Sequence, residues 1–545
     1  LAGTINNRRY ESFNGPKTYD GIDYDGHSIT ANSFLNYNVD IQKLNIAATL
    51  GYEYNENYSK SYVMDIGGFP DIPGLEGPAN GSEYLWADWN ISGNTRWTER
   101  SESYFFRANL SYNRKYLLGF SIRRDGTSKL AKENRYSNFP AVSAGWVISD
   151  EAFMSRQHVI NLLKLRTSYG MTGSITNVSM ADCYDRLSSD IYWGKPALSV
   201  ASTLGNPDLQ WEKTNQVDVG VDLALFQNRL TLIAEWYLKR TSGMMNSEPL
   251  PSSTGGYTSR KINAGTIRNS GVDLALNFQH HFTKDWGLTA GINMNINRSK
   301  VIDLPVDNWA YSSAYYGGGN TPRPRLKIGQ SFGALEMYRA LGLDERGDII
   351  YDDVSGNGSI DAADKVIIDN LTPKFTGGLN LGVSWKNLSL FGQFSFTYGG
   401  KIYNLDEQLL RSTELGYDDV MKNKPDYILD RWTQENQSSR YPRFVVGAHG
   451  AQNETGWNDR PSTLYLFDAS FLKLNKLTLS YNLPQNWIQK LGMTSCSVYL
   501  SGENLFTLKN KKLNAPDPEA ALTSGIAQKG VPSPRSFMIG LDLTF

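Results

Sequence analysis

The sequence has little of what catalytic, metal-binding or helical membrane proteins usually require. It contains 2 cysteines and 5 histidines, without the spacing of a zinc site and without an H-E-x-x-H, G-x-S-x-G or P-loop motif. No apolar run approaches the ~20 residues of a membrane-spanning helix. The 54 lysines and arginines nearly balance the 55 aspartates and glutamates. These absences predict a protein that is not an enzyme, binds no nucleic acid and has no transmembrane helix.

What the sequence does contain is apolar and polar side chains that alternate at every second position. The last nine residues, Phe537 to Phe545, place Phe, Ile, Leu, Leu and Phe on one side and Met, Gly, Asp and Thr on the other. Only a β-strand has this period. The same pattern recurs in pairs of segments joined by short turns, at 35–54, 106–122, 217–238, 272–296 and 379–396. The sequence therefore predicts amphipathic strands that form antiparallel hairpins.

Short and long connections alternate strictly along the predicted strands. The long ones are 56–102, 124–138, 173–213, 241–265, 299–375, 400–468 and 506–534. This asymmetry is typical of outer-membrane barrels, which have short periplasmic turns and long extracellular loops. We therefore predict an all-β fold, a transmembrane antiparallel β-barrel, with about 15 strands of roughly the ~9–11 residues that cross a bilayer. A large secreted protein made of β-sandwiches is the alternative.

Aromatic residues make up 12% of the chain, and several lie near the ends of predicted strands. They are Tyr52, Tyr54, Tyr112, Trp146, Trp236, Tyr237 and Trp385. In a barrel they are expected to form the aromatic girdles at the two membrane interfaces. In a sandwich the same residues would fill the core.

The direction of each strand follows from the alternation of turns and loops. If the short turns are periplasmic, the last strand descends from the loop 506–534, and the first strand, near Ser33, also descends. Residues 1–32 are then expected in an extracellular loop. Because bacterial single-chain barrels have even strand numbers, an odd count predicts that residues 1–545 are the C-terminal part of a longer barrel protein. The start Leu-Ala-Gly, without an initiator methionine, supports the same expectation.

The segment 353–364 has the spacing of a calcium-binding loop. Oxygen-bearing residues occupy positions 1, 3, 5, 7, 9 and 12, and Gly358 occupies the sharp-turn position 6. The candidate ligands are Asp353, Ser355, Asn357, Ser359 through its backbone carbonyl, Asp361 and Asp364. Serine at position 3 and aspartate at position 12 predict a weak, structural extracellular site. The alternative is an Asx-rich turn that holds no metal.

Aromatic residues in two long loops are candidates for stacking on a substrate. They are Trp309, Tyr311, Tyr315 and Tyr316, which precede a run of three glycines, and Trp86 and Trp89. Aromatic rings offer large contact area at a low cost in side-chain entropy. The alternative is that these rings pack the loops.

Motifs from about residue 100 to the end of the chain resemble the SusC/RagA family of TonB-dependent outer-membrane transporters. The matching segments are 116–128, 139–146, 163–170, 206–213, 268–272, 373–378, 472–479, 501–506 and 517–519, in family order. Each motif is weak by itself, and together they are specific.

The resemblance implies a plugged barrel of about 22 strands, whose N-terminal plug and first strands are not visible in this sequence. It further implies TonB-dependent import of oligosaccharides or peptides, energy from the TonB-ExbB-ExbD complex, and a SusD-like lipoprotein as a lid. Outer-membrane lipid would surround the barrel. A passive porin and a secreted glycan-binding β protein are the alternatives.

Overall fold

The computed structural model describes most of the chain. The described residues are 7–9, 19–66, 95–192, 195–306, 309–310, 321–369, 371–411, 426–444, 457–489, 492–513, 517–521, 525–528 and 532–545. They form two compact units. Unit 1 comprises residues 1–146, 167–217 and 241–264, and unit 2 comprises 147–166, 218–240 and 265–545.

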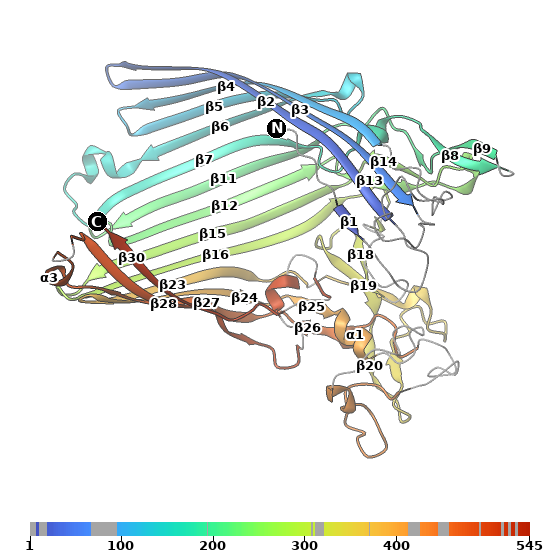
Figure 1. The fold of residues 1–545 in the computed structure, drawn as a ribbon. Coiled ribbons are helices and arrows are strands. Elements are labelled where there is room, and N and C mark those ends of the chain that lie inside the picture. The colour runs from blue at the N-terminus through green and yellow to red at the C-terminus, as the bar shows by residue number, and fades with distance from the viewer. Residues whose placement is uncertain are drawn as a thin grey trace, which may run out of the picture. The chain divides into compact units, whose positions relative to one another are not determined.

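One antiparallel sheet of 16 strands dominates the structure, in the order β1-β2-β3-β4-β5-β6-β7-β11-β12-β15-β16-β23-β24-β27-β28-β30 (Figure 1). Each strand pairs with the next one of the sheet in chain order, which is the meander that the alternation predicted. The prediction of an all-β fold with about 15 strands is confirmed. Among the described residues, no helix is long and apolar enough to cross a membrane.

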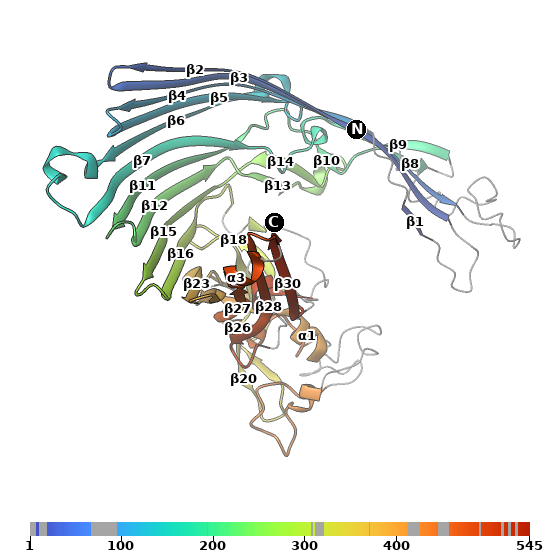
Figure 2. The same cartoon turned by 60° about the vertical axis from the view of Figure 1, so that its left-hand side comes forward.

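Unit 1 contributes one strand of 3 residues and five strands of 12 to 23 residues to the sheet. They are β1 (Asn7–Arg9), β2 (Tyr19–Ile41), β3 (Leu44–Ile66), β4 (Thr95–Tyr112), β5 (Tyr116–Thr127) and β6 (Tyr136–Val147). Strands β2 to β6 lie side by side (Figures 1 and 2). The prediction that residues 1–32 form a loop is wrong for 19–32, which belong to β2. The reason is that the polar residues of this segment pair along their whole length with β3, from Tyr19 opposite Ile66 onward.

The remaining sheet strands belong wholly or partly to unit 2. They are β7 (Ile160–Ser174), β11 (Glu212–Leu225), β12 (Leu230–Ser242), β15 (Thr266–His281), β16 (Trp286–Asp303), β23 (Phe375–Trp385), β24 (Leu388–Tyr398), β27 (Phe471–Asn482), β28 (Ser495–Lys509) and β30 (Ser536–Thr544). Strands β7, β11 and β12 are shared with unit 1.

The strand registers separate an apolar face of the sheet from a polar face. In unit 2, one apolar row runs through directly paired residues, Leu288, Val383, Leu390, Leu479, Leu500 and Ile539. The neighbouring row on the other face is Gly287, Ser384, Ser389, Ser480, Tyr499 and Gly540. A slip of one residue would exchange the two faces, so the sequence alternation fixes the register.

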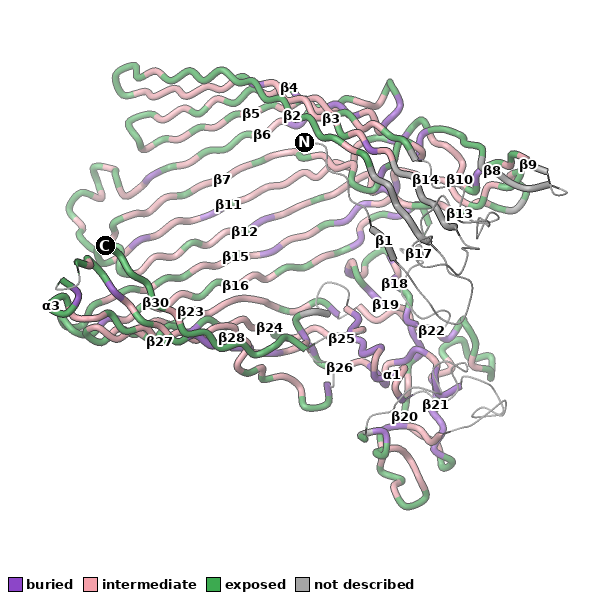
Figure 3. Tube along the Cα trace, viewed as in Figure 1, coloured by how far each residue is buried: buried purple, intermediate pink, exposed green. Residues whose placement is uncertain are grey.

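The last strand, β30, exposes its apolar side chains as predicted. Phe537, Ile539 and Phe545 are 74%, 79% and 79% exposed. Of the predicted girdle residues, Tyr112, Trp146, Trp236 and Trp385 are exposed. In Figure 3 buried residues gather mainly in the long connections, whereas exposed and half-buried residues alternate along the strands.

The short turns are held by left-handed backbone conformations. Gln42 in the turn between β2 and β3 has φ +54°, and Lys386 between β23 and β24 has φ +53°. Such mirror-image turns match the twist of the flanking strands, and residues other than glycine adopt them at a cost. Tight pairing on both sides of each turn offsets that cost.

The long connections contain small sheets and helices of their own. Their elements are β8 (Leu187–Tyr192), β9 (Lys195–Val200), β10 (Thr203–Leu204), β13 (Met245–Pro249), β14 (Ser259–Asn263), β17 (Trp309–Ala310), β18 (Arg323–Leu326), β19 (Ala334–Tyr338), β20 (Ala340–Leu343), β21 (Ile349–Tyr351), β22 (Lys365–Ile368), β25 (Lys401–Asn404), α1 (Leu405–Arg411), β26 (Leu466–Asp468) and β29 (Ile526–Ala527), whereas the short helix α3 (Gln485–Ile488) lies in the connection between β27 and β28. In unit 2 they enclose a core that includes Met337, Tyr403 and Tyr465, all fully buried.

Candidate functional site

The polar face of unit 2 places hydrogen-bonding side chains in register on neighbouring strands. Asp273 on β15 pairs with Asn295 on β16, which pairs with Thr376 on β23. Side chains that lie directly opposite each other in an antiparallel pair are ~5 Å apart. The Asn295 amide accordingly donates a hydrogen bond to the Asp273 carboxylate. The alternation of the sequence thus brings a carboxylate, an amide and a hydroxyl group into one row.

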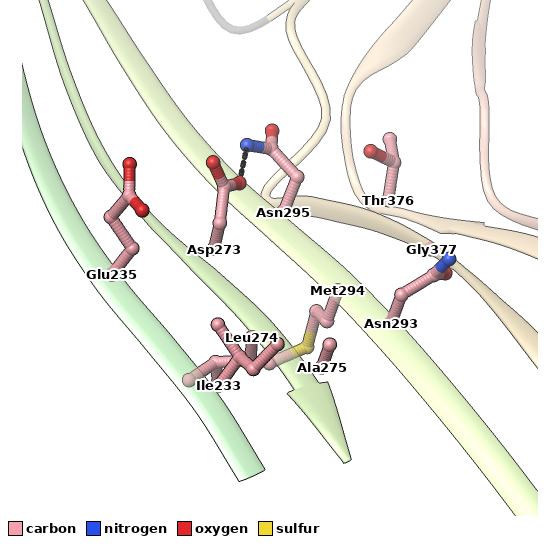
Figure 4. A pocket seen from close by; sticks show the side chains of 10 residues that line it. All are labelled: Ile233, Glu235, Asp273, Leu274, Ala275, Asn293, Met294, Asn295, Thr376 and Gly377. Carbon is pink, nitrogen blue, oxygen red and sulfur yellow. Dashed lines mark hydrogen bonds between the residues drawn. The ribbon is translucent and has the colours of Figure 1, made fainter. Parts of the chain in front are cut away.

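A hollow of about 420 Å³ lies against this row. It is lined by Ile233, Glu235, Asp273, Leu274, Ala275, Asn293, Met294, Asn295, Thr376 and Gly377 (Figure 4). The polar ends of Glu235, Asp273, Asn295 and Thr376 point to the same side of the strands. Its volume lies within the ~300–1,000 Å³ of typical ligand sites. Its carboxylates accept hydrogen bonds, and its amides both donate and accept them.

Arg166 of β7 joins the hollow to the neighbouring part of the polar face. Its Nη1 lies 2.5 Å from a Glu235 carboxylate oxygen, and its Nε lies 3.1 Å from one of Asp222. Gly220 provides the space for this bridge, because a Cβ there would lie 2.8 Å from the guanidinium carbon of Arg166. One carboxylate of the hollow is therefore charge-paired.

Tyr237 was predicted to belong to an aromatic girdle, and this prediction is wrong. Its side chain is 7% exposed and lies on the polar face, where its hydroxyl donates to the Asn297 side-chain oxygen at 3.1 Å. Asn295 also approaches the hydroxyl, at 3.4 Å. The neighbouring residue Trp236 is 44% exposed and keeps the predicted orientation. In a strand only one of two adjacent aromatic residues can face lipid.

The predicted calcium loop is built around the Asp353 carboxylate. One oxygen accepts the backbone N–H of Gly356 at 2.8 Å and that of Asn357 at 3.3 Å, and the other accepts Gly358 at 2.9 Å. Gly356 and Gly358 have φ of +70° and +78°, which glycine adopts without steric cost. The sharp turn predicted at Gly358 is present.

The C-terminal end of the loop is closed by Asp364. Its two oxygens accept the backbone N–H of Ser355 at 2.9 Å and of Asp361 at 2.8 Å. These hydrogen bonds lower the pKa of the fully buried Asp364 carboxyl below its ordinary value, and the bond from the Asp361 N–H has the largest effect. Asp361 itself caps the short helix Ala362–Asp364 by accepting the Ala363 N–H. The six predicted ligands therefore belong to one hydrogen-bonded loop.

The loop's donor set is compatible with a hard cation, although its carboxylates are already engaged. Within the described part of the chain, no three side chains of His, Cys, Asp or Glu are grouped closely enough to hold a metal ion. Each carboxylate oxygen has two lone pairs, so one that accepts a single N–H retains an acceptor site. Ser355, Asn357 and the Ser359 carbonyl would add uncharged oxygens.

A buried ion pair lies within helix α1, among the long connections of unit 2. Glu407 and Arg411 are one turn apart, and the Arg411 Nε lies 2.9 Å from the Glu407 carboxylate. Tyr441 donates to the same carboxylate at 2.6 Å, and the Arg411 guanidinium lies 3.2 Å from the Tyr441 ring centre. Sequence reasoning missed this network. The available signals were the capping residue Asn404, which accepts the Glu407 N–H, and the i,i+4 pair.

The predicted stacking residues are mostly beyond what the structure describes. Trp309 is described only in its backbone, in β17, where it pairs with Leu326 of β18. The other five, Tyr311, Tyr315, Tyr316, Trp86 and Trp89, lie outside the described residues. Their part in substrate binding stays a prediction.

Comparisons with known proteins agree with the fold. A family model described as TonB dependent receptor-like, beta-barrel matches residues 2–505. TonB-dependent receptor P3 of Formosa agariphila is 27% identical over 551 residues, covering 94% of this chain and 52% of the relative. TonB-dependent receptor SusC of Bacteroides thetaiotaomicron is 29% identical over 459 residues, covering 81% and 43%. The chain spans about half the length of these curated relatives.

Among solved structures, that of the RagAB peptide transporter superimposes with a TM-score of 0.79 at 26% identity, covering 97% of this chain and 56% of that one. The predicted resemblance to SusC and RagA is thereby confirmed, and with it the location in the outer membrane. The family consists of transporters and receptors, which agrees with the prediction that the protein is not an enzyme. The chain belongs to the TonB-dependent receptor-like β-barrel family and is of the SusC/RagA type.

Proposed function

We propose that this chain is the C-terminal barrel portion of a transporter that imports oligosaccharides or peptides across the outer membrane by TonB-dependent active transport. Membership of the family supports the transport class. The likeness to the RagAB peptide transporter supports peptides as one substrate class. The polar face of the sheet would line the lumen, and the apolar face would contact outer-membrane lipid.

The observation that carries this proposal is the hollow beside Asp273, whose lining includes two carboxylates and two amides. Oligosaccharide hydroxyls and peptide amides are both hydrogen-bond donors, and the carboxylates of Glu235 and Asp273 accept from such groups. Asn293 and Asn295 supply donors for hydroxyl or carbonyl oxygens. A wall of this kind can hold a polar substrate at several points, each of modest strength, and release it again.

Partners of the whole protein belong to the same proposal. A SusD-like surface lipoprotein would cover the barrel and deliver substrate, and the TonB-ExbB-ExbD complex would supply energy through an N-terminal plug. The resemblance to SusC and RagA supports both expectations. The aromatic residues Trp309, Tyr311, Tyr315, Tyr316, Trp86 and Trp89 would contribute stacking contacts on the extracellular side.

Uptake measurements with variants of the hollow test the substrate proposal. Glu235→Gln combined with Asp273→Asn removes both carboxylates and keeps their shape, so uptake of labelled substrate should fall about tenfold or more, since each bond to a charged group contributes ~1.5–3 kcal/mol. The control, Asp285→Asn with Glu345→Gln, removes the same charge from a turn and an exposed loop. Labelled peptide and oligosaccharide pools identify the class. If the hollow variant imports both pools as the wild type does, the hollow is not on the substrate path.

We also propose that the loop 353–364 binds one calcium ion with a structural role. The support is the six-position donor pattern and the two left-handed glycines that shape the loop. Millimolar extracellular calcium would fill even a weak site of this type. The ion would neutralise part of the negative charge of Asp353 and Asp361.

Hydrogen exchange before and after chelation tests the calcium proposal. Chelation should increase amide exchange across 353–364 and leave the turn at Lys386 unchanged. The variant Asp361→Asn should reproduce the increase in the presence of calcium. Identical exchange in this loop with and without chelator would refute a bound ion.

A further inference from the structure

One face of a small sheet in the long connection between β16 and β23 carries an excess of positive charge. The sheet consists of β17, β18, β19 and β22. Arg323 of β18 pairs with Glu336 of β19, and Lys365 of β22 pairs with Tyr338 of β19. Because residues two apart in a strand share a face, Arg323 and Lys365 lie on the same side of the sheet. The cationic cluster consists of these two residues with Arg325 and Arg460.

The buried Tyr338 ring contacts two members of the cluster. The Lys365 Nζ lies 5.3 Å from the ring centre, and the guanidinium carbon of Arg460 lies 5.2 Å from it. Both are cation–π contacts, which restrict the cationic side chains. Arg460 also donates to the Ile360 carbonyl at 3.0 Å. Carboxylates of the loop 353–364 act on the Tyr338 hydroxyl as well, but they accept backbone N–H groups of their own loop.

Glu336 is the only carboxylate in the four strands of this sheet, and it is already paired. Arg325 donates to one of its oxygens through Nε at 3.0 Å and through Nη2 at 2.8 Å. Within the described part of the chain, neither Arg323 nor Lys365 forms an ion pair. Two cations of this face are therefore left to pair with an anion from outside the chain.

The charges of the cluster act on one another. Burial lowers the pKa of Lys365 most, and the neighbouring charges of Arg323, Arg325 and Arg460 lower it further, whereas Glu336 raises it. Like charges that are held close together repel each other. An anion placed among them would therefore be attracted to the cluster and would relieve this repulsion.

The spacing of Arg323 and Lys365 suits a single carboxylate. By the strand registers they are two strands and two residues apart, or about 12 Å between Cα atoms. Side chains as long as those of arginine and lysine can meet at one group between these positions. Guanidinium and ammonium groups donate charge-assisted hydrogen bonds to carboxylates, as Arg325 does to Glu336.

We propose that the cationic cluster binds carboxylate groups of acidic peptides before they enter the barrel, an inference that rests on the proposed import function. The long connections of such barrels face the cell exterior, where substrate arrives. A basic surface there raises the local concentration of anionic substrate. The likeness to the RagAB peptide transporter favours a peptide, and every peptide with a free C-terminus carries at least one carboxylate.

Fluorescence polarisation with the whole protein, purified in nonionic detergent at low ionic strength, tests this proposal. The probes are a labelled peptide with two glutamates, the same peptide with two glutamines, and a labelled uronic-acid oligosaccharide. Arg323→Gln with Lys365→Gln should bind the glutamate peptide about tenfold more weakly than the wild type, since each partly exposed ion pair contributes on the order of threefold. Its affinity for the glutamine peptide should change little.

The control, Lys511→Gln with Lys512→Gln, removes equal charge from exposed positions in the connection between β28 and β30. It should bind the glutamate peptide as the wild type does. Retained heat-modifiable migration in electrophoresis checks that each variant is a folded barrel.

Three results would overturn the proposal. Equal affinity of the wild type for the two peptides would show that the carboxylates are not recognised. Equal affinity of the cluster variant and the wild type for the glutamate peptide would show that Arg323 and Lys365 do not hold it. Binding of the uronic-acid probe alone, lost in the cluster variant, would assign the cluster to an acidic glycan. Because this assay needs no energy source, its outcome is independent of whether import depends on TonB.

Discussion

The buried pair of Glu407 and Arg411 permits a sharp prediction about the long connections of unit 2. Glu407 is 1% exposed and receives hydrogen bonds or ion pairs from Arg411, Tyr441 and Asn404. Replacing Glu407 with Gln keeps the size of the side chain and removes its charge. The Arg411 side chain, which is 5% exposed and stacks on the Tyr441 ring, would then lose its ion pair with Glu407.

Glu407→Gln should cost the free energy that is lost when one partner of a buried ion pair is removed. Removing one partner typically costs about 3–5 kcal/mol, whereas replacing both with apolar groups is often close to neutral. Arg411 retains its contact with the Tyr441 ring, so we take the lower end, about 3 kcal/mol. A local opening free energy reduced by about 3 kcal/mol corresponds to roughly 100-fold faster exchange. Glu407→Gln with Arg411→Met should recover most of the protection.

Amide hydrogen exchange across 401–411 and 457–468 is the assay. The matched control is Glu345→Gln, which removes an exposed carboxylate of the same unit and should leave exchange unchanged. If Glu407→Gln exchanges no faster than Glu345→Gln, the ion pair does not hold this core. If the double variant exchanges as fast as the single one, the loss of protection does not arise from the broken ion pair of Arg411 with Glu407.

Three further predictions concern other charged groups. Lys473→Met should increase proteolysis within 517–521, because it removes the ammonium group 2.8 Å from the Asp517 carboxylate, and adding Asp517→Asn should restore part of the resistance. Because backbone N–H groups lower the pKa of Asp364, the stability that this carboxylate gives the loop is complete above the ordinary aspartate pKa of about 4 and is lost as pH falls through the lowered value. Protection factors in 353–364, which correct exchange for its intrinsic dependence on pH, should therefore stay constant from pH 7 to 5 and fall only below about pH 4. Gly220→Ala should displace Arg166 and lower the free energy of unfolding by about 1 kcal/mol in denaturant melts. If Gly220→Ala lowers the free energy of unfolding by the same amount in a protein that already carries Arg166→Gln, the effect does not arise from the displaced arginine.

The sheet was predictable because a period of two needs few residues to be recognised. In β23 and β24 the apolar row and the polar row follow directly from the sequence, and the turn at Lys386 fixes their register. The calcium-loop turn at Gly358 was predictable for the same reason, since its spacing is local. The segment 19–32 was missed because its polar side chains do not alternate with apolar ones. It forms a strand because its backbone pairs with β3.

The buried contacts of the long connections were beyond sequence reasoning. Asp348 forms a two-bond ion pair with Arg443, at 2.7 and 2.9 Å, across 95 residues of sequence. The two carboxylates of the hollow come from separate strands, β12 and β15, which only the strand order places together. Contacts between residues so far apart in the sequence depend on the topology of the whole fold, and no local sequence pattern predicts them.

Energy-dependent uptake tests the central claim, TonB-dependent active import, most directly. Cells that produce the whole protein as their only importer of this type are given labelled peptide and oligosaccharide pools, with and without a protonophore or a deletion of TonB. We predict that substrate accumulates against its gradient in untreated cells and that accumulation is lost in both other conditions. Uptake that continues at the same rate without TonB and without the proton gradient would show passive flow through the barrel and contradict active import.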